Sequence, residues 1–136
     1  MTEQRPNFTG TWLLDLKRSS LQIAPPTTST FRIEHQEPNF RLSRTHVYGE
    51  MSDTWSIALT TDGTEHSQKN GDLDVRARLN WVGSALEAEL KSNREGEEAD
   101  VVVCYAITDG GRTLTAVERL RSAAQSYDNT WVFERQ

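Results

Sequence analysis

Six polar residues of this chain have the types and the positions to do chemistry together. They are His35, Arg44, His46, His66, Gln68 and Glu118. Each lies in a stretch where apolar and polar residues alternate, at a position that matches the apolar ones. Because successive side chains of a strand point to opposite faces, all six should share the inward face with apolar side chains. Ionisable groups on an inward face are costly unless they are paired or used.

Two kinds of chemistry would use this set. Arg44 could meet the carboxylate, phenolate or sulfonate of an amphipathic ligand, with His46 as a second donor. Alternatively, Glu118 and an inward histidine, His46 or His35, could serve as acid and base on an apolar substrate. We therefore predict a protein that binds a small apolar or amphipathic molecule. The alternative is a small, cofactor-independent isomerase, dehydratase or cyclase, because no motif for covalent catalysis is present.

The histidines do not predict a metal site. On the expected register His35 and His46 lie on neighbouring strands but roughly 13 Å apart along them. No local ligand spacing such as His-x-His occurs in the sequence. We predict no metal and no cofactor, although ligation of haem by one histidine stays open.

Length and composition indicate a single domain spanning residues 1–136. The chain has 26% charged and 35% hydrophobic residues, as an ordinary globular protein does. The formal charge of −5 argues against nucleic acid or anionic lipid as a partner. No run reaches the roughly 18 apolar residues of a membrane span. The opening MTEQRPNF has no apolar signal-peptide core, and Cys104 is the single cysteine. We expect a cytoplasmic protein, and the oligomeric state is left open.

Turn signals recur at intervals of about 8–12 residues, which is typical of an all-β sandwich or barrel. Asp62-Gly63 and Asn70-Gly71 are the strongest, because both residues of a type I′ turn must tolerate positive φ. The predicted strands cover about 10–16, 28–37, 40–48, 53–61, 64–69, 72–82, 85–92, 100–108, 113–122 and 128–135. A meander with one apolar face closes into an up-and-down antiparallel β-barrel of eight to ten strands, which also removes its edges.

Each turn also predicts a register between the strands that it joins. We place these turns at Pro38-Asn39, Gly49–Ser52, Asp62-Gly63, Asn70-Gly71 and Gly83-Ser84. The resulting pairs include His35–Leu42, Ile33–Arg44, His46–Trp55, Leu59–His66, His66–Val75 and Trp81–Leu86. Closure of the barrel pairs the last strand with the first. Arg135 should then lie over the ring of Trp12 at one barrel end, in a cation–π contact.

These registers predict an internal pocket with apolar walls and a few convergent polar groups, the usual form of a small-molecule site. The predicted walls are Phe31, Ile33, Phe40, Leu42, Trp55, Ile57, Leu79 and Tyr105, and the predicted polar contacts are Arg44, His46 and Glu118. An interaction protein with a filled barrel is a third possibility. It follows from the volume of the four inward tryptophans, which are Trp12, Trp55, Trp81 and Trp131.

Two short motifs resemble a known family group. Phe8-Thr9-Gly10-Thr11-Trp12 is similar to the Phe-x-Gly-x-Trp start of lipocalins and fatty-acid-binding proteins, the calycins. The ending TWVFERQ, residues 130–136, is similar to the last strand of the fatty-acid-binding proteins. The chain also resembles small lipocalin-like proteins of bacteria. The resemblance implies a barrel of eight to ten strands around a cavity for a small, largely apolar molecule.

The chain departs from the fatty-acid-binding pattern at two places. Residues 17–27 are too few for the pair of helices that covers the barrel in that family. The positions of its Arg-x-Tyr motif hold Trp131 and Phe133, which cannot pair with a carboxylate. A long-chain fatty acid is therefore not the expected ligand.

Overall fold

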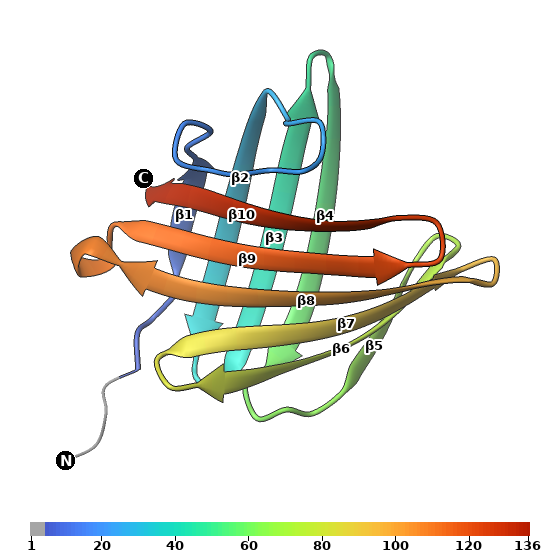
Figure 1. The fold of residues 1–136 in the computed structure, drawn as a ribbon. Helices are drawn as coiled ribbons and strands as arrows, with labels where there is room; N and C mark the ends of the chain where they lie inside the picture. The colour runs from blue at the N-terminus through green and yellow to red at the C-terminus, as the bar shows by residue number, and fades with distance from the viewer. Residues whose placement is uncertain (1–4) are drawn as a thin grey trace.

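Ten antiparallel strands make up most of the computed structural model, which describes residues 5–136 (Figure 1). The strands are β1 (Gly10–Leu14), β2 (Thr28–Gln36), β3 (Asn39–Tyr48), β4 (Met51–Thr60), β5 (His66–Asn70), β6 (Leu73–Val82), β7 (Ala85–Arg94), β8 (Glu97–Thr108), β9 (Thr113–Ser122) and β10 (Ser126–Arg135), with a short 3₁₀ turn, η1 (Asp109–Gly111). They form one sheet in the order β4-β3-β2-β1-β10-β9-β8-β7-β6-β5. The predicted all-β, up-and-down barrel is confirmed.

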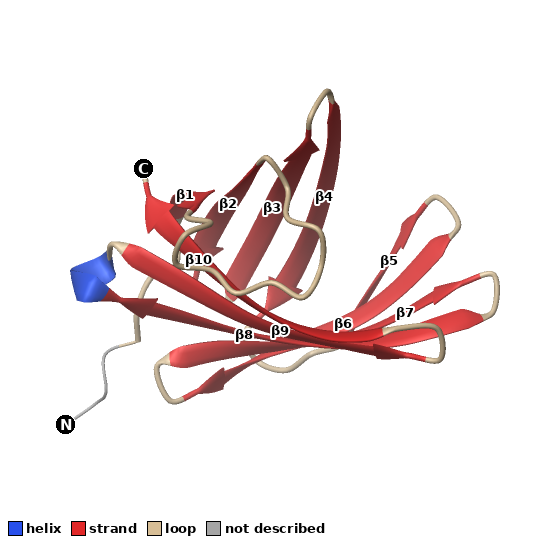
Figure 2. Ribbon diagram, turned by 45° about the horizontal axis from the view of Figure 1, so that its top comes forward, coloured by secondary structure: helices blue, strands red, loops and turns tan. Residues whose placement is uncertain are grey.

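The sheet curls on itself until its two halves face each other. Strands β2–β4 run across the direction of β8–β10, and the space between the two groups is the barrel interior (Figure 2). Alternation decides which side chains enter it. In β2, Phe31, Ile33 and His35 are buried, whereas Arg32 and Glu34 are exposed. Among the described residues, no helix has the length and apolar character to span a membrane.

Several predicted registers are wrong by two residues. His35 pairs with Phe40 and Arg44 with Trp55, because β2–β3 and β3–β4 turn at 37–38 and 49–50. The β5–β6 register is displaced in the same way, and His66 faces Ala77. The predicted pair Trp81–Leu86 is confirmed. A shift of two residues leaves every side chain on the same face, so the predicted inward faces survive the error.

The predicted hairpin between β4 and β5 is also wrong, since these two strands are the edges of the sheet. The turn after β4 is held by β6 instead: Gly63 N donates to Leu79 O over 2.9 Å, and Asp62 pairs with Asn80. The chain then reaches β5 without a backbone ladder to β4. Side chains bridge the seam, where Gln68 Nε2 donates to Ser56 O over 2.8 Å. The barrel is therefore nearly closed.

Trp12 plugs one end of the barrel, as predicted. Its side chain is fully buried, and its Nε1 donates to Phe8 O over 3.1 Å. Arg135 is its register partner, with the guanidinium carbon 4.3 Å from the ring centre. The guanidinium also donates to Thr9 O over 2.6 Å and to Gly111 O over 2.8 Å. The contact between the first and last strands is confirmed.

Gly10 is required where the plug meets the chain. Its φ is 155°, and a Cβ on it would lie 2.9 Å from Arg135 Nη1. We expect Gly10→Ala to lower the free energy of unfolding by about 1–2 kcal/mol through backbone strain and displacement of the arginine. Chemical denaturation measures the loss. Gly49→Ala is a control for backbone strain alone, because Gly49 also has positive φ but a Cβ there would meet nothing within 4 Å. Equal losses in the two variants would contradict a steric role for the arginine contact.

Candidate ligand-binding cavity

A cavity of about 630 Å³ occupies the barrel interior beyond the Trp12 plug. Its mouth is marked by the lining residues Asp53, Thr54, Asn70 and Gly71, which are exposed. Asp53 and Thr54 lie near the start of β4, Asn70 ends β5, and Gly71 begins the turn that follows β5. The full lining is Phe31, Leu42, Arg44, His46, Asp53, Thr54, Trp55, Asn70, Gly71, Leu73, Val75, Leu90, Ser92, Arg94, Val101, Val103, Tyr105, Ala116, Glu118, Leu120, Tyr127 and Trp131.

The cavity brings together seven of the eleven residues predicted for the site. They are Phe31, Leu42, Arg44, His46, Trp55, Tyr105 and Glu118. The other four lie elsewhere. Phe40, Ile57 and Leu79 surround a space of only about 10 Å³ nearer the plug, and Ile33 is buried outside both spaces. Aromatic packing of Phe8 with Phe40 and Trp81 fills this half of the barrel.

Arg44 lies at the edge of the cavity, with 28% of its side chain exposed. Its Nη2 is 4.0 Å from Asp53 Oδ2, and its guanidinium carbon is 5.5 Å from the centre of the Trp55 ring. The Nε atom is buried and has no partner within residues 5–136. One donor of Arg44 therefore lacks an acceptor, while its guanidinium has a carboxylate and an aromatic face beside it.

His46 is buried in the cavity wall. Its Nδ1 lies 2.7 Å from Ser29 Oγ, and its ring stacks on Trp131 with centroids 5.2 Å apart. Burial lowers the pKa of His46 to about 4, and the charge of Arg44 acts in the same direction, while Asp53 opposes it. The imidazole is consequently neutral at pH 7, when it can serve as a polar contact but carries no charge.

Glu118 presents a carboxylate from β9. Its Oε1 accepts hydrogen bonds from Asn129 Nδ2 and Trp131 Nε1, each over 3.0 Å. Within the described part of the chain, no hydrogen bond reaches Oε2. Burial raises the pKa of both Tyr105 and Tyr127, Glu118 adds to the increase, and Arg44 opposes it. The two phenols therefore lie within the influence of both charges.

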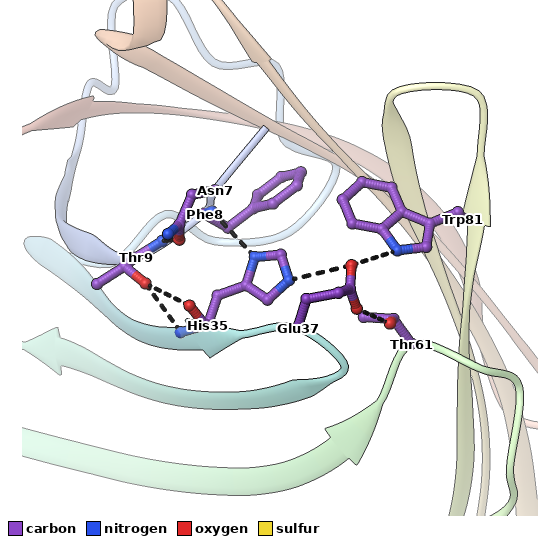
Figure 3. Close-up of polar contacts among 7 residues, drawn as sticks. All are labelled: Asn7, Phe8, Thr9, His35, Glu37, Thr61 and Trp81. Carbon is purple, nitrogen blue, oxygen red and sulfur yellow. Dashed lines mark hydrogen bonds and ion pairs between the residues drawn. The ribbon is translucent and has the colours of Figure 1, made fainter. Parts of the chain in front are cut away.

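His35 belongs to the plugged end of the barrel rather than to the cavity (Figure 3). Phe8 N donates to its Nδ1 over 3.2 Å, and Glu37 Oε2 lies 3.7 Å from its Nε2. Glu37 also accepts hydrogen bonds from Trp81 Nε1, over 2.8 Å, and from Thr61 Oγ1. Burial lowers the pKa of His35, against the influence of Glu37. These contacts attach the N-terminal segment to the barrel wall.

The structure separates the three histidines. His66 lies at the β4–β5 seam, where its Nε2 is 2.9 Å from Thr60 Oγ1. Across residues 5–136, no group of three or more His, Cys, Asp or Glu side chains is placed to hold a metal ion. Nor does any hydrogen bond or ion pair in that range join Glu118 to a histidine. Trp131 stands between Glu118 and His46, stacking on the imidazole and donating to the carboxylate.

Fifteen of the 22 lining residues were not predicted from the sequence, and Tyr127 is one of them. Asn129, which is buried outside the lining and holds Glu118, was also missed. Asn129 also accepts a hydrogen bond from Gln22 N over 2.7 Å, which ties the β1–β2 connection to the site. Alternation could have found both residues, since they lie two and four positions before the inward Trp131. The predicted strand began at 128, one residue too late to include Tyr127.

Comparison with known proteins defines the class by fold. No family model and no curated protein matches the chain. Among solved structures, a secretory abundant heat soluble (SAHS) protein of Ramazzottius varieornatus is 9% identical, with 99% of this chain and 100% of that chain covered and a TM-score of 0.71. Human cRBP IV is 16% identical over 96% and 99% of the two chains, with a TM-score of 0.60. SAHS protein 4 of R. varieornatus is 14% identical over 99% of each chain, also with a TM-score of 0.60. The barrel is calycin-like, as its end motifs predicted.

Proposed function

We propose that this protein binds a small apolar or amphipathic molecule inside its barrel. The observation that carries the proposal is the cavity of about 630 Å³, which is within the usual size of small-molecule sites. Its walls include Phe31, Leu42 and Val103, and its polar groups are few. Apolar walls provide the free energy of binding, whereas a few polar groups orient the ligand.

One structural neighbour supports this class of function. Human cRBP IV is, by its name, a cellular retinol-binding protein, and its barrel has the same overall course as this one. At 16% identity the likeness concerns the fold, so the support for binding comes from the cavity itself.

We propose the cytoplasm as the compartment, because a single cysteine, Cys104, suits a reducing environment.

A cavity-filling substitution tests the proposal. Ala116 is buried on β9 and lines the cavity, while its neighbour Val117 points outward and is 50% exposed. We expect the neutral fluorescent probe N-phenyl-1-naphthylamine to bind the parent protein, and Ala116→Phe to weaken binding tenfold or more by occupying the space. Val117→Phe, the matched control on the opposite face, should bind like the parent. A fluorescence titration measures all three.

A second variant that fills the cavity distinguishes two causes of weaker binding, namely a smaller cavity and an unfolded protein. Ser92 is a half-buried lining residue on β7, where a larger side chain has more freedom to adjust. Ser92→Phe should also weaken binding of the probe, and its melting temperature should be near that of the parent. Absence of probe binding to the folded parent, or equal binding by parent, Ala116→Phe and Ser92→Phe, would overturn the proposal and favour a filled barrel.

A further inference from the structure

Two side chains of opposite charge, Arg44 and Glu118, line the cavity inside its mouth. Four charged side chains line the cavity, namely Arg44, Asp53, Arg94 and Glu118. Asp53 and Arg94 are at the mouth, with side chains 73% and 57% exposed, so water screens their charges. His46 adds no charge at pH 7, because burial holds its pKa near 4. Inside the mouth, the ligand therefore faces one positive charge, on Arg44, and one negative charge, on Glu118.

Glu118 is held in one orientation. Asn129 and Trp131 both donate to Oε1, and both are buried themselves. This leaves Oε2 as an acceptor without a donor from any described residue. A fixed carboxylate oxygen in a partly dry cavity interacts well with a ligand that donates a hydrogen bond, and unfavourably with a second anion.

Arg44 by itself is poorly placed to recognise an anionic ligand. The Asp53 carboxylate, screened by water at the mouth, lies 4.0 Å from its guanidinium, and the centre of the Trp55 ring lies 5.5 Å from it, so the arginine already has two partners. Its buried Nε nevertheless lacks an acceptor among residues 5–136. Arg44 and Glu118 line the same cavity, together with Tyr105 and Tyr127.

We propose that the natural ligand carries a neutral hydroxyl group, as an alcohol or a phenol does, and that Glu118 is the residue that selects it. This inference rests on the proposed binding function. A hydroxyl can donate to Glu118 Oε2 and can accept from Arg44, so an uncharged head group suits either residue. A carboxylate would be attracted by Arg44 but repelled by Glu118, and an ammonium the reverse, so neither ion gains a net attraction that offsets the loss of its hydration. This proposal differs from the sequence-based prediction of an anionic head group, which placed Arg44 beside it with His46 as a second donor.

Three ten-carbon compounds that differ in the head group test the inference. Decan-1-ol, decanoate and decylammonium each displace N-phenyl-1-naphthylamine from the parent at pH 7.5, and the inhibition constants are compared. We expect decan-1-ol to bind at least tenfold more tightly than either ion. In Glu118→Gln the preference for decan-1-ol over decanoate should fall at least tenfold, because the anion is no longer repelled. Glu89→Gln, on the exposed face of β7, should keep the preference of the parent.

The outcomes are distinct from those of the binding test. If the probe fails to bind the parent, the proposed function itself is wrong. If the probe binds but the parent prefers decanoate or decylammonium, the hydroxyl assignment is overturned. An unchanged head-group preference in Glu118→Gln, with the variant folded and binding the probe, would remove Glu118 from recognition.

Discussion

Replacement of Trp12 by alanine is expected to lower the free energy of unfolding by roughly 3–5 kcal/mol, as truncation of a large buried aromatic side chain does. The indole is fully buried, closes one end of the barrel, donates to Phe8 O and lies under the guanidinium of Arg135. Its loss would leave a void between the first and last strands. Denaturant unfolding of parent and variant measures the change.

Trp55→Ala is the matched control for this effect. Trp55 is also a tryptophan beside an arginine, but it is only half-buried at the wall of an existing cavity. Truncation there enlarges a space that is already open, so we expect a clearly smaller loss of stability. If the two variants unfold with the same loss, or if Trp12→Ala melts like the parent, Trp12 is not a structural plug.

Acidification should destabilise the protein through His46. Its pKa is about 4 in the folded state and 6.5 in an unfolded chain, so below pH 6.5 the unfolded state binds more protons. The free energy of unfolding should therefore fall as the pH drops from 6.5 toward 4. The contribution of His46 is expected to be roughly 2 kcal/mol between pH 7.5 and pH 5, because about 1.4 kcal/mol is lost for each pH unit below 6.5.

His46→Gln isolates this contribution. Glutamine keeps polar atoms near Ser29 but cannot take up a proton in this range. Urea unfolding at pH 7.5, 6 and 5 should show a smaller loss on acidification in the variant than in the parent. His35, whose pKa is also lowered by burial, should supply the loss that remains. An identical pH dependence in parent and variant would show that His46 is not buried as a neutral base.

The course of the barrel could be predicted from the sequence because it depends on local patterns. Alternation of apolar and polar residues located ten strands with modest errors at their ends, and turn signals separated them. The wrong registers arose at the turns, where a shift from 38–39 to 37–38 moves the pairing by two residues. A shift of two residues keeps each side chain on the same face of the sheet. Arg44, His46 and Glu118 could therefore still be expected inside the barrel.

The edges of the sheet could not be predicted in this way. Asp62-Gly63 is a strong hairpin signal, yet Gly63 donates to Leu79 O and the turn is held by β6. A backbone partner so distant in sequence leaves no mark on the local pattern. The result is the open seam between β4 and β5, across which Gln68 and Ser56 are joined only through a side chain.

By itself the sequence determined the faces: which side chains point inward, that Trp12 meets Arg135, and that a few ionisable groups must share the interior. Only the tertiary structure decided how far along the barrel each of them lies. It separates His35, held beside Glu37 at the plugged end, from Glu118 and His46 in the cavity. The reason is physical, since alternation sets the direction of a side chain, whereas its depth depends on strand tilt, register and the packing of distant aromatic rings.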